Sequence, residues 1–145
     1  FGMATIERFE DIEAWRVARE LTRKVYAASR NGAFSRDFGL RDQIRRASVS
    51  IMANIAEGFE RGGTAEFAQF LSTAKASAGE VESHLYVALD ENYISRSDFE
   101  SLRTLAGSSK RLIAGFMHYL RRTPIRGIKY KKHNNLSTAD DTPNP

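Results

Sequence analysis

The sequence predicts an all-α protein, folded as an antiparallel up-down-up-down four-helix bundle. Apolar residues recur every three to four positions in four separate segments, which is the spacing that gives a helix one buried face. No segment alternates between apolar and polar residues for long enough to indicate a strand, and no proline occurs before Pro124. The connections between the segments are short, which favours antiparallel neighbours.

The first two segments end at residues that commonly terminate helices. The first covers about residues 11–28, and Asn31-Gly32 follow it as the expected C-terminal cap. The second covers about residues 38–59, with Asp37 as the expected N-cap and Gly62-Gly63 beyond its end. The predicted core positions are Phe9, Ile12, Trp15, Ala18, Leu21 and Val25 in the first, and Leu40, Ile44, Ala47, Ile51, Ile55 and Gly58 in the second.

The third and fourth segments carry the most regular patterns. The third covers about residues 65–90, is expected to be capped by Thr64, and has a heptad seam at Phe67, Leu71, Ala74, Ala78, Val81, Leu85 and Ala88. The fourth begins at Ser97-Asp98-Phe99-Glu100, where Ser97 and Glu100 are the expected capping box. Its predicted core positions are Phe99, Leu102, Leu105, Leu112, Phe116 and Leu120.

The chain divides into one domain and two ends. Residues 9–122 are the predicted bundle, residues 1–8 a flexible N-terminus, and residues 123–145 a basic and then disordered tail. Cysteine is absent, which excludes disulfides, thiolate catalysis and cysteine-ligated zinc. No apolar run approaches the roughly 20 residues of a membrane span. We therefore expect a soluble, cytoplasmic protein without a membrane partner.

Charge is distributed unevenly along the 145 residues. The net charge of +4 resides after Leu120, where six basic residues accompany two acidic ones. Residues 16–46 hold nine basic and three acidic side chains, whereas residues 57–100 hold three basic and nine acidic ones. Such a domain can attract its own copies head to tail or dock a charged partner. The same pattern is also compatible with solvated helix faces.

The second helix has a second apolar arc beside its core face. On a helical wheel its core positions fall within roughly 80°, and no charged residue lies between Ala47 and Ala56. An exposed apolar surface of this kind is usually an interface. The sequence therefore predicts self-association through Val49, Met52, Ala53, Ala56 and Phe59.

The remaining arc of the second helix is polar. Arg46, Ser50, Asn54 and Glu57 follow one another at steps of four, four and three, with Gln43 and Arg61 on the same line. One interpretation is a solvated stripe supported by i,i+4 pairs. The favoured interpretation is a polar network between helices or subunits, in which Asn54 and Glu57 hydrogen-bond across a contact and fix its register.

Several motifs resemble the four-helix-bundle family encoded in 23S rRNA intervening sequences. The opening Phe9-Glu10-Asp11-Ile12-Glu13-Ala14-Trp15 is similar to its first signature, and Arg45-Arg46-Ala47-Ser48-Val49-Ser50-Ile51, then Asn54-Ile55-Ala56-Glu57-Gly58, to its most recognisable motif. The third segment adds Phe67, Phe70-Leu71, Ala74, Ser77 and Glu80-Val81-Glu82-Ser83. The resemblance covers about residues 8–121. Ala76 stands where glycine is expected, and Phe59 where a small residue is common.

The resemblance implies a bundle that assembles as a homo-oligomeric ring, with five subunits the expected state. Distant relatives of this family include the accessory protein of diversity-generating retroelements, which binds nucleic acid and a reverse transcriptase. The resemblance therefore adds a possible nucleic-acid role to the fold and leaves the partner open.

Enzymatic chemistry has little support in the sequence. A diiron bundle needs Glu and Glu-x-x-His pairs facing inward from its helices, whereas Glu80 and His84 lie four apart and have no matching pair. Gly62-Gly63 lacks the Gly-Lys-Ser/Thr of a phosphate loop and suits a turn. We therefore expect no catalytic residues, no metal and no cofactor.

Two basic groups favour nucleic-acid binding instead. One comprises Arg41, Arg45 and Arg46, together with Arg36, and the other comprises Arg121, Arg122, Arg126, Lys129, Lys131 and Lys132, with Tyr130 available to stack on a base. The leading hypothesis is a non-enzymatic oligomer that binds RNA or single-stranded DNA as an accessory to a nucleoprotein. The alternatives are a tail that serves solubility alone and a structural or adaptor protein whose partner is another protein.

Overall fold

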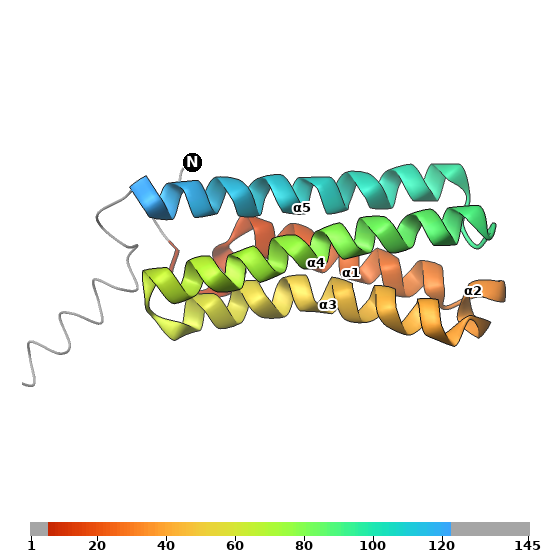
Figure 1. Ribbon diagram of the computed structural model, residues 1–145, viewed down its shortest axis with the longest axis horizontal. Coiled ribbons are helices and arrows are strands. Elements are labelled where there is room, and N and C mark those ends of the chain that lie inside the picture. Colours follow the sequence, from red (N-terminus) through yellow and green to blue (C-terminus); the bar gives the residue numbers. More distant parts are fainter. Residues whose placement is uncertain (1–5, 123–145) are drawn as a thin grey trace, which may run out of the picture.

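A computed structural model describes residues 6–122, and it consists of helices and short turns. The elements in chain order are the 3₁₀ turn η1 (Phe9–Asp11), α1 (Glu13–Ser29), α2 (Gly32–Arg36), α3 (Phe38–Arg61), α4 (Thr64–Asp90) and α5 (Arg96–Arg122). The four long helices form the bundle, and α2 lies at one end of it (Figure 1). The predicted all-α bundle is therefore confirmed.

Each long helix packs chiefly against two others. Helix α1 contacts α3 and α5, and α4 contacts the same two, so that α1 and α4 occupy opposite corners of the bundle. Neighbouring long helices run antiparallel, and η1 and α2 are short elements outside this arrangement (Figure 1). Residues on α1 and α4 that point outward therefore face opposite sides of the molecule.

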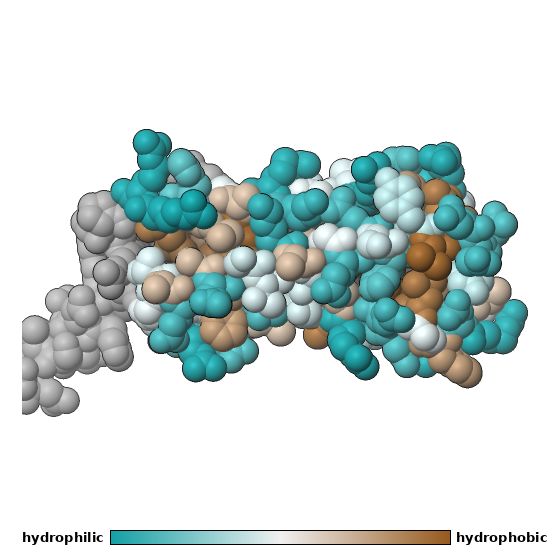
Figure 2. All heavy atoms as spheres, viewed as in Figure 1, coloured by the Kyte–Doolittle hydropathy of each residue, from teal (hydrophilic) through white to brown (hydrophobic). Residues whose placement is uncertain are grey.

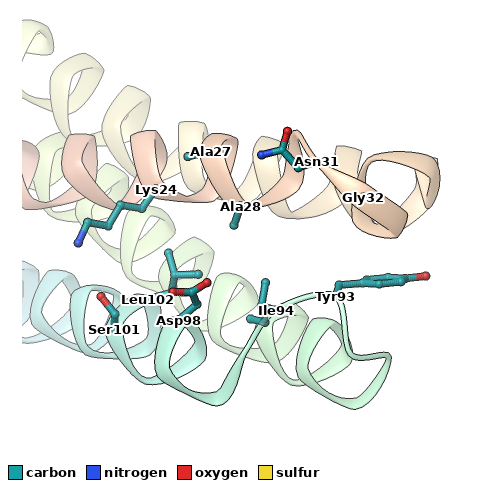
Figure 3. Close-up of a pocket in the computed structure, with 10 residues that line it drawn as sticks. All are labelled: Lys24, Ala27, Ala28, Asn31, Gly32, Tyr93, Ile94, Asp98, Ser101 and Leu102. Atoms are coloured by element: carbon teal, nitrogen blue, oxygen red, sulfur yellow. The ribbon is translucent and has the colours of Figure 1, made fainter.

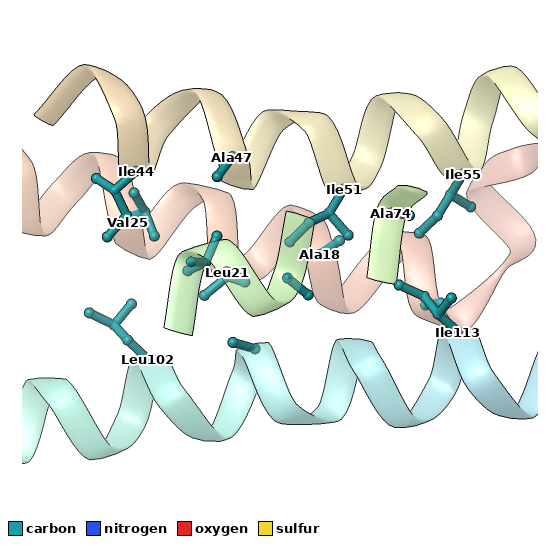
Figure 4. Packing of buried hydrophobic residues seen from close by; sticks show 14 of the residues in the cluster. Ala18, Leu21, Val25, Ile44, Ala47, Ile51, Ile55, Ala74, Leu102 and Ile113 are labelled. Carbon is teal, nitrogen blue, oxygen red and sulfur yellow. The ribbon is translucent and has the colours of Figure 1, made fainter. Parts of the chain in front are cut away.

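The core is a single apolar cluster in which all four long helices take part. All seven predicted heptad residues of α4 are buried, and so are all six predicted core residues of α3. Figure 4 shows Leu21, Ile51 and Ile113 pointing inward from α1, α3 and α5. In α5, Leu105 and Leu112 are only half-buried, because the inner face is completed by Ala106, Ser109 and Ile113.

The structure corrects three predicted helix ends. Asn31-Gly32 do not cap α1, because Arg30 ends that helix and Gly32, with a φ of +61°, begins the unpredicted helix α2. Thr64 does not cap α4, since Gly63 is the N-cap and the Thr64 hydroxyl is buried without a hydrogen bond.

The capping box predicted for α5 is also wrong. The helix begins at Arg96, one residue before Ser97. The Ser95 hydroxyl accepts a 3.0 Å hydrogen bond from the Asp98 backbone N–H, which is the function expected of Ser97. The Glu100 carboxylate instead pairs with Arg96 at 3.4 Å. A serine two residues earlier thus provides the same kind of cap.

Asp37 connects three segments at one end of the bundle. One carboxylate oxygen accepts the Leu40 backbone N–H at 3.1 Å and caps α3, as predicted. The other accepts the hydroxyl of Tyr93, in the α4–α5 turn, at 2.9 Å. The Tyr93 ring stacks on Phe34, which is the buried residue of α2, with ring centroids 5.3 Å apart. Helix α2, the start of α3 and the α4–α5 turn are thereby held together.

Gly58 lies at a close contact between α3 and α4. A Cβ atom at this position would lie 2.7 Å from the Phe70 Cβ and 2.9 Å from the Phe67 Cδ1. The glycine therefore sets how near the two helices come.

None of the helices within residues 6–122 combines the length and the apolar character needed to cross a bilayer.

We predict that Gly58→Ala lowers the free energy of unfolding by about 1–2 kcal/mol, because overpacking outweighs the helix propensity gained. Gly79→Ala is the matched control, since a Cβ there meets nothing within 4 Å. In that helix interior alanine should raise stability by roughly 0.5–1 kcal/mol. Urea unfolding of both variants measures the difference, and equal effects of the two substitutions would contradict the account of the α3–α4 contact.

A second prediction concerns alkaline pH. The hydrogen bond to Asp37 raises the pKa of Tyr93 above its ordinary value, and desolvation and the charge of Asp37 add to the effect. The folded state thus favours the protonated phenol, so this contribution is complete below about pH 10 and is lost as pH rises through the raised pKa. Tyr93→Phe should lower stability at neutral pH and make the alkaline decline shallower. A decline of unchanged steepness in urea titrations would contradict this.

Candidate nucleic-acid interface

The outer side of α1 carries a row of four arginines. Arg16, Arg19, Arg23 and Arg30 are all exposed, and steps of three, four and seven keep them on one side of the helix. The row extends about 21 Å along the axis. We call these four residues the α1 arginine row.

A hollow of about 590 Å³ lies beside this row, between α1 and α3. We call it the α1–α3 groove. Lys24 adds a further positive charge to the groove, and Glu20 is the only acidic residue in its lining. The full lining consists of Arg19, Glu20, Thr22, Arg23, Lys24, Tyr26, Ala27, Arg30 and Met52. The groove is therefore strongly basic, with an apolar contribution from Met52 of α3.

The predicted basic group on α3 divides between two sides of the helix. Arg45 points toward α1, where its Nε donates to the Ser29 Oγ at 2.8 Å and its guanidinium lies 4.7 Å from the centre of the Tyr26 ring. Arg46 is exposed and turned about 100° further around the helix, away from the groove. Only one member of this pair therefore adjoins the α1–α3 groove.

Arg41 is fixed by contacts with nearby residues of α2 and α3. Its guanidinium pairs with Asp42 at 3.0 Å, donates to the Ser35 carbonyl oxygen at 3.1 Å and lies over the Phe38 ring. These contacts attach the start of α3 to α2. Arg41 therefore has a structural role in addition to the binding role predicted for it.

The second predicted basic group lies at the other end of the bundle. Arg121 and Arg122 are exposed in the last turn of α5, at the end of the bundle where α3 ends and α4 begins (Figure 1). They are separated from Arg41 by about 30 Å along the bundle. Arg126, Lys129, Lys131 and Lys132 lie outside the described residues. Within residues 6–122, the basic group on α3 and the described part of the C-terminal basic group therefore lie at opposite ends of the bundle.

The apolar arc predicted as an oligomer interface is only partly at the surface. Val49 is 41% exposed, Ala53 is also exposed, and Met52 and Ala56 are half-buried. Phe59 is 4% exposed because its ring packs against Phe67 of α4 at 6.1 Å. Phe59 therefore belongs to the core and not to the surface arc. In Figure 2, with α1 at the back, atoms of intermediate hydropathy gather along the middle of the visible face.

The polar line on α3 contains both arrangements that the sequence left open. The Ser50 Oγ bonds the Ser77 Oγ of α4 at 2.9 Å, and the Asn54 amide donates to the Ser50 Oγ and carbonyl at 3.0 and 2.8 Å. This part is a network between helices. The predicted bonds of Asn54 and Glu57 across a helix contact are not formed, because the Asn54 amide bonds within α3 and Glu57 pairs with Arg61 at 2.9 Å on the surface of the same helix.

The comparisons with known proteins agree with this architecture. The model of the family described as 23S rRNA-intervening sequence protein matches residues 10–115. The chain belongs to this family. The resemblance seen in the sequence is thereby confirmed.

A solved structure resembles this member of the 23S rRNA-intervening sequence protein family. It is the crystal structure of a protein with unknown function from the S23 ribosomal protein family of Bacteroides thetaiotaomicron VPI-5482. The two chains are 25% identical, with a TM-score of 0.66, and the match covers 72% of this chain and 97% of the other. No curated protein matches the chain at a significant level.

A second hollow, also of about 590 Å³, lies between the end of α1 and the start of α5. Figure 3 shows Lys24 and Asn31 on one wall, and Asp98 and Ser101 on the other. Its lining has one basic and one acidic side chain, so it lacks the charge excess of the α1–α3 groove. Within residues 6–122, no group of three or more His, Asp or Glu side chains is placed to hold a metal ion.

Sequence reasoning missed the α1 arginine row as a site, although its signal was present. The excess of basic residues over 16–46 was visible, and a wheel of α1 places these arginines on one side. The sequence did not indicate which helix packs beside α1. Only the packing of α3 beside α1 brings Arg45 and Met52 next to the row.

We predict that Ser50→Ala and Ser77→Ala are coupled. A double-mutant cycle in urea should give an interaction energy of about 0.5–1.5 kcal/mol, the usual net contribution of one hydrogen bond. Glu57→Gln is the control from the same polar line, and loss of its exposed ion pair should cost about 0–1 kcal/mol. Additive effects of the two serine substitutions would contradict the inter-helix network.

Proposed function

We propose that this protein is a non-enzymatic, self-associating helical bundle that binds RNA or single-stranded DNA, as an accessory to a nucleoprotein. The observation that carries the proposal is the α1 arginine row beside the basic α1–α3 groove. Arginine side chains recognise phosphate well because their planar guanidinium donates several hydrogen bonds in a fixed geometry.

The arrangement of charge around the bundle supports this orientation. Helix α4 carries four acidic residues and one basic one, and it occupies the corner opposite α1. On α5, Lys110 pairs with Glu82 of α4 at 2.8 Å, and Arg103 lies over the Tyr86 ring of α4. These two cations are therefore directed toward α4. A polyanion approaching the molecule is attracted to the α1 side and repelled from the α4 side.

Self-association is the second part of the proposal. Val49 and Ala53 are exposed on a part of α3 without charged side chains, and such surfaces in a helix are usually covered by a partner. The ring of five subunits is what the family resemblance implies. Repeating the α1 arginine row in each subunit would multiply the positive charge offered to one nucleic-acid strand.

Binding of a labelled RNA of mixed sequence across a salt series tests the nucleic-acid part. The full chain should bind with an affinity that falls steeply with salt, and a chain ending at Arg122 should bind more weakly with a shallower slope. Arg23→Ala with Arg30→Ala should reduce the logarithmic slope by about 1.4, or 0.7 for each phosphate contact on a single strand. Absence of binding at low salt would reject the proposal.

The matched control for these variants is Arg96→Ala. Arg96 is exposed on the first turn of α5 and is paired with Glu100, away from the groove. Its loss removes one positive charge, whereas the groove variant removes two, so general electrostatic attraction alone would lower the slope half as much in the control. A reduction more than twice that of the control identifies the α1 side as the binding side.

Val49→Glu tests self-association. A carboxylate placed in an apolar contact carries a large desolvation cost, so the mass in solution should fall to the 16.3 kDa of one chain while the helical content is retained. Ser97→Glu, exposed at the start of α5, is the control and should leave the mass unchanged. Sedimentation measures both. An unchanged mass for Val49→Glu would instead favour a structural or adaptor protein whose exposed Val49–Ala53 surface binds another protein.

A further inference from the structure

Two arginine–aromatic pairs occupy the side of α1 that faces α3. Arg19 lies over the Trp15 ring at 5.9 Å, and Arg45 of α3 lies over the Tyr26 ring at 4.7 Å. Trp15 and Tyr26 are eleven residues apart on α1, which is about 16 Å along the helix. Arg19 and Tyr26 both line the α1–α3 groove, so one pair lies toward each end of it.

Both guanidinium groups are positioned by their neighbours. The Arg45 Nε donates to the Ser29 Oγ at 2.8 Å, which fixes the plane of the group. Trp15 is itself packed edge to face against Phe9, with ring centroids 5.1 Å apart, which holds the ring beneath Arg19. Arg19 is exposed and Arg45 is half-buried, so both side chains are accessible from solvent, Arg19 more fully.

A planar cation with one open face is a surface on which an unpaired base can stack. Bases within a duplex are stacked on one another, so their faces are not available for such a contact. Arg23 lies between the two pairs along α1 and Arg30 just beyond the second; both are exposed for phosphate contacts, and Met52 offers an apolar surface. The groove volume of about 590 Å³ lies in the usual range for a small-molecule site.

We infer that the α1–α3 groove binds single-stranded nucleic acid, with unpaired bases stacked on the Arg19 and Arg45 guanidinium planes and the backbone directed along the α1 arginine row. This inference rests on the proposed function and specifies the site and the strandedness of the ligand. It predicts a preference for single strands that charge alone does not produce, because a duplex has the higher charge density.

Glu20 is the one group in the groove that opposes a phosphate. Its carboxylate pairs with Arg23 at 2.8 Å, and the side chains of Arg23 and Glu20 are 72% and 41% exposed. Exposed ion pairs of this kind contribute little to stability and are easily exchanged for another anion. Glu20→Gln should therefore strengthen binding of the single strand while the fold is unaffected.

The test uses the full chain with a labelled single-stranded RNA of mixed sequence and with the same RNA as a duplex. Arg19→Lys keeps the charge and removes the plane, and it should weaken single-strand binding about tenfold, in the range of one lost base–aromatic stack. Arg96→Lys is the matched control, because Arg96 is exposed at the start of α5 and pairs with Glu100 at 3.4 Å, outside the groove, and it should leave the affinity nearly unchanged. Arg45→Lys should act as Arg19→Lys does.

Trp15 provides a second readout, since it is the only tryptophan of the chain. Its emission should change on addition of the single strand and remain constant with the duplex. If Arg45→Lys lowers stability through the loss of the Ser29 hydrogen bond, Arg19→Lys and the Trp15 emission still decide the question.

The outcomes separate this inference from the proposed function. Salt-sensitive binding in which duplex and single strand are equal, or in which Arg19→Lys matches Arg96→Lys, overturns the single-strand site and leaves nucleic-acid binding in place. Absence of binding to either RNA at low salt rejects both.

Discussion

The close approach of α3 and α4 at Gly58 determines how the rest of the bundle is arranged. The missing side chain lets Phe67 and Phe70 lie against the α3 backbone, and small residues such as Ala74 and Ala78 continue the contact along α4. Further along the same contact the Ser50–Ser77 hydrogen bond satisfies the polar groups between the helices. With α3 and α4 in close contact, α1 and α5 complete the core on the other side, and the α1 arginine row faces outward beside α3.

The fold could be predicted from periodicity because the core positions repeat regularly. The heptad of α4 and the inner face of α3 require only the sequence spacing, and all their predicted residues are buried. The helix ends were less predictable, since both Ser95 and Ser97 precede an acidic residue by three positions and only one can cap α5. Phe59 was assigned to the surface because its wheel position lies at the edge of the core face. The close contact at Gly58 brings Phe67 near enough to cover its ring.

The candidate site was less predictable than the fold, because neighbouring residues on a helix point in different directions. Arg45 and Arg46 are adjacent in sequence, yet only Arg45 reaches α1. Conversely, Arg19 and Arg45 are 26 residues apart, and the packing of α1 against α3 places both at the α1–α3 groove. Counting basic residues along the chain indicated an electrostatic role. The particular surface depends on which helices are neighbours, and a single sequence does not specify that.

Photocrosslinking would show directly which side of the bundle nucleic acid occupies, and we expect the α1 side. The full chain would be irradiated with a single-stranded RNA carrying photoreactive uridines, and the modified peptides located by mass spectrometry. The account predicts adducts on α1 and on the first half of α3, with Trp15 and Tyr26 among the modified residues. Adducts confined to α4, or to residues after Arg122, would contradict it.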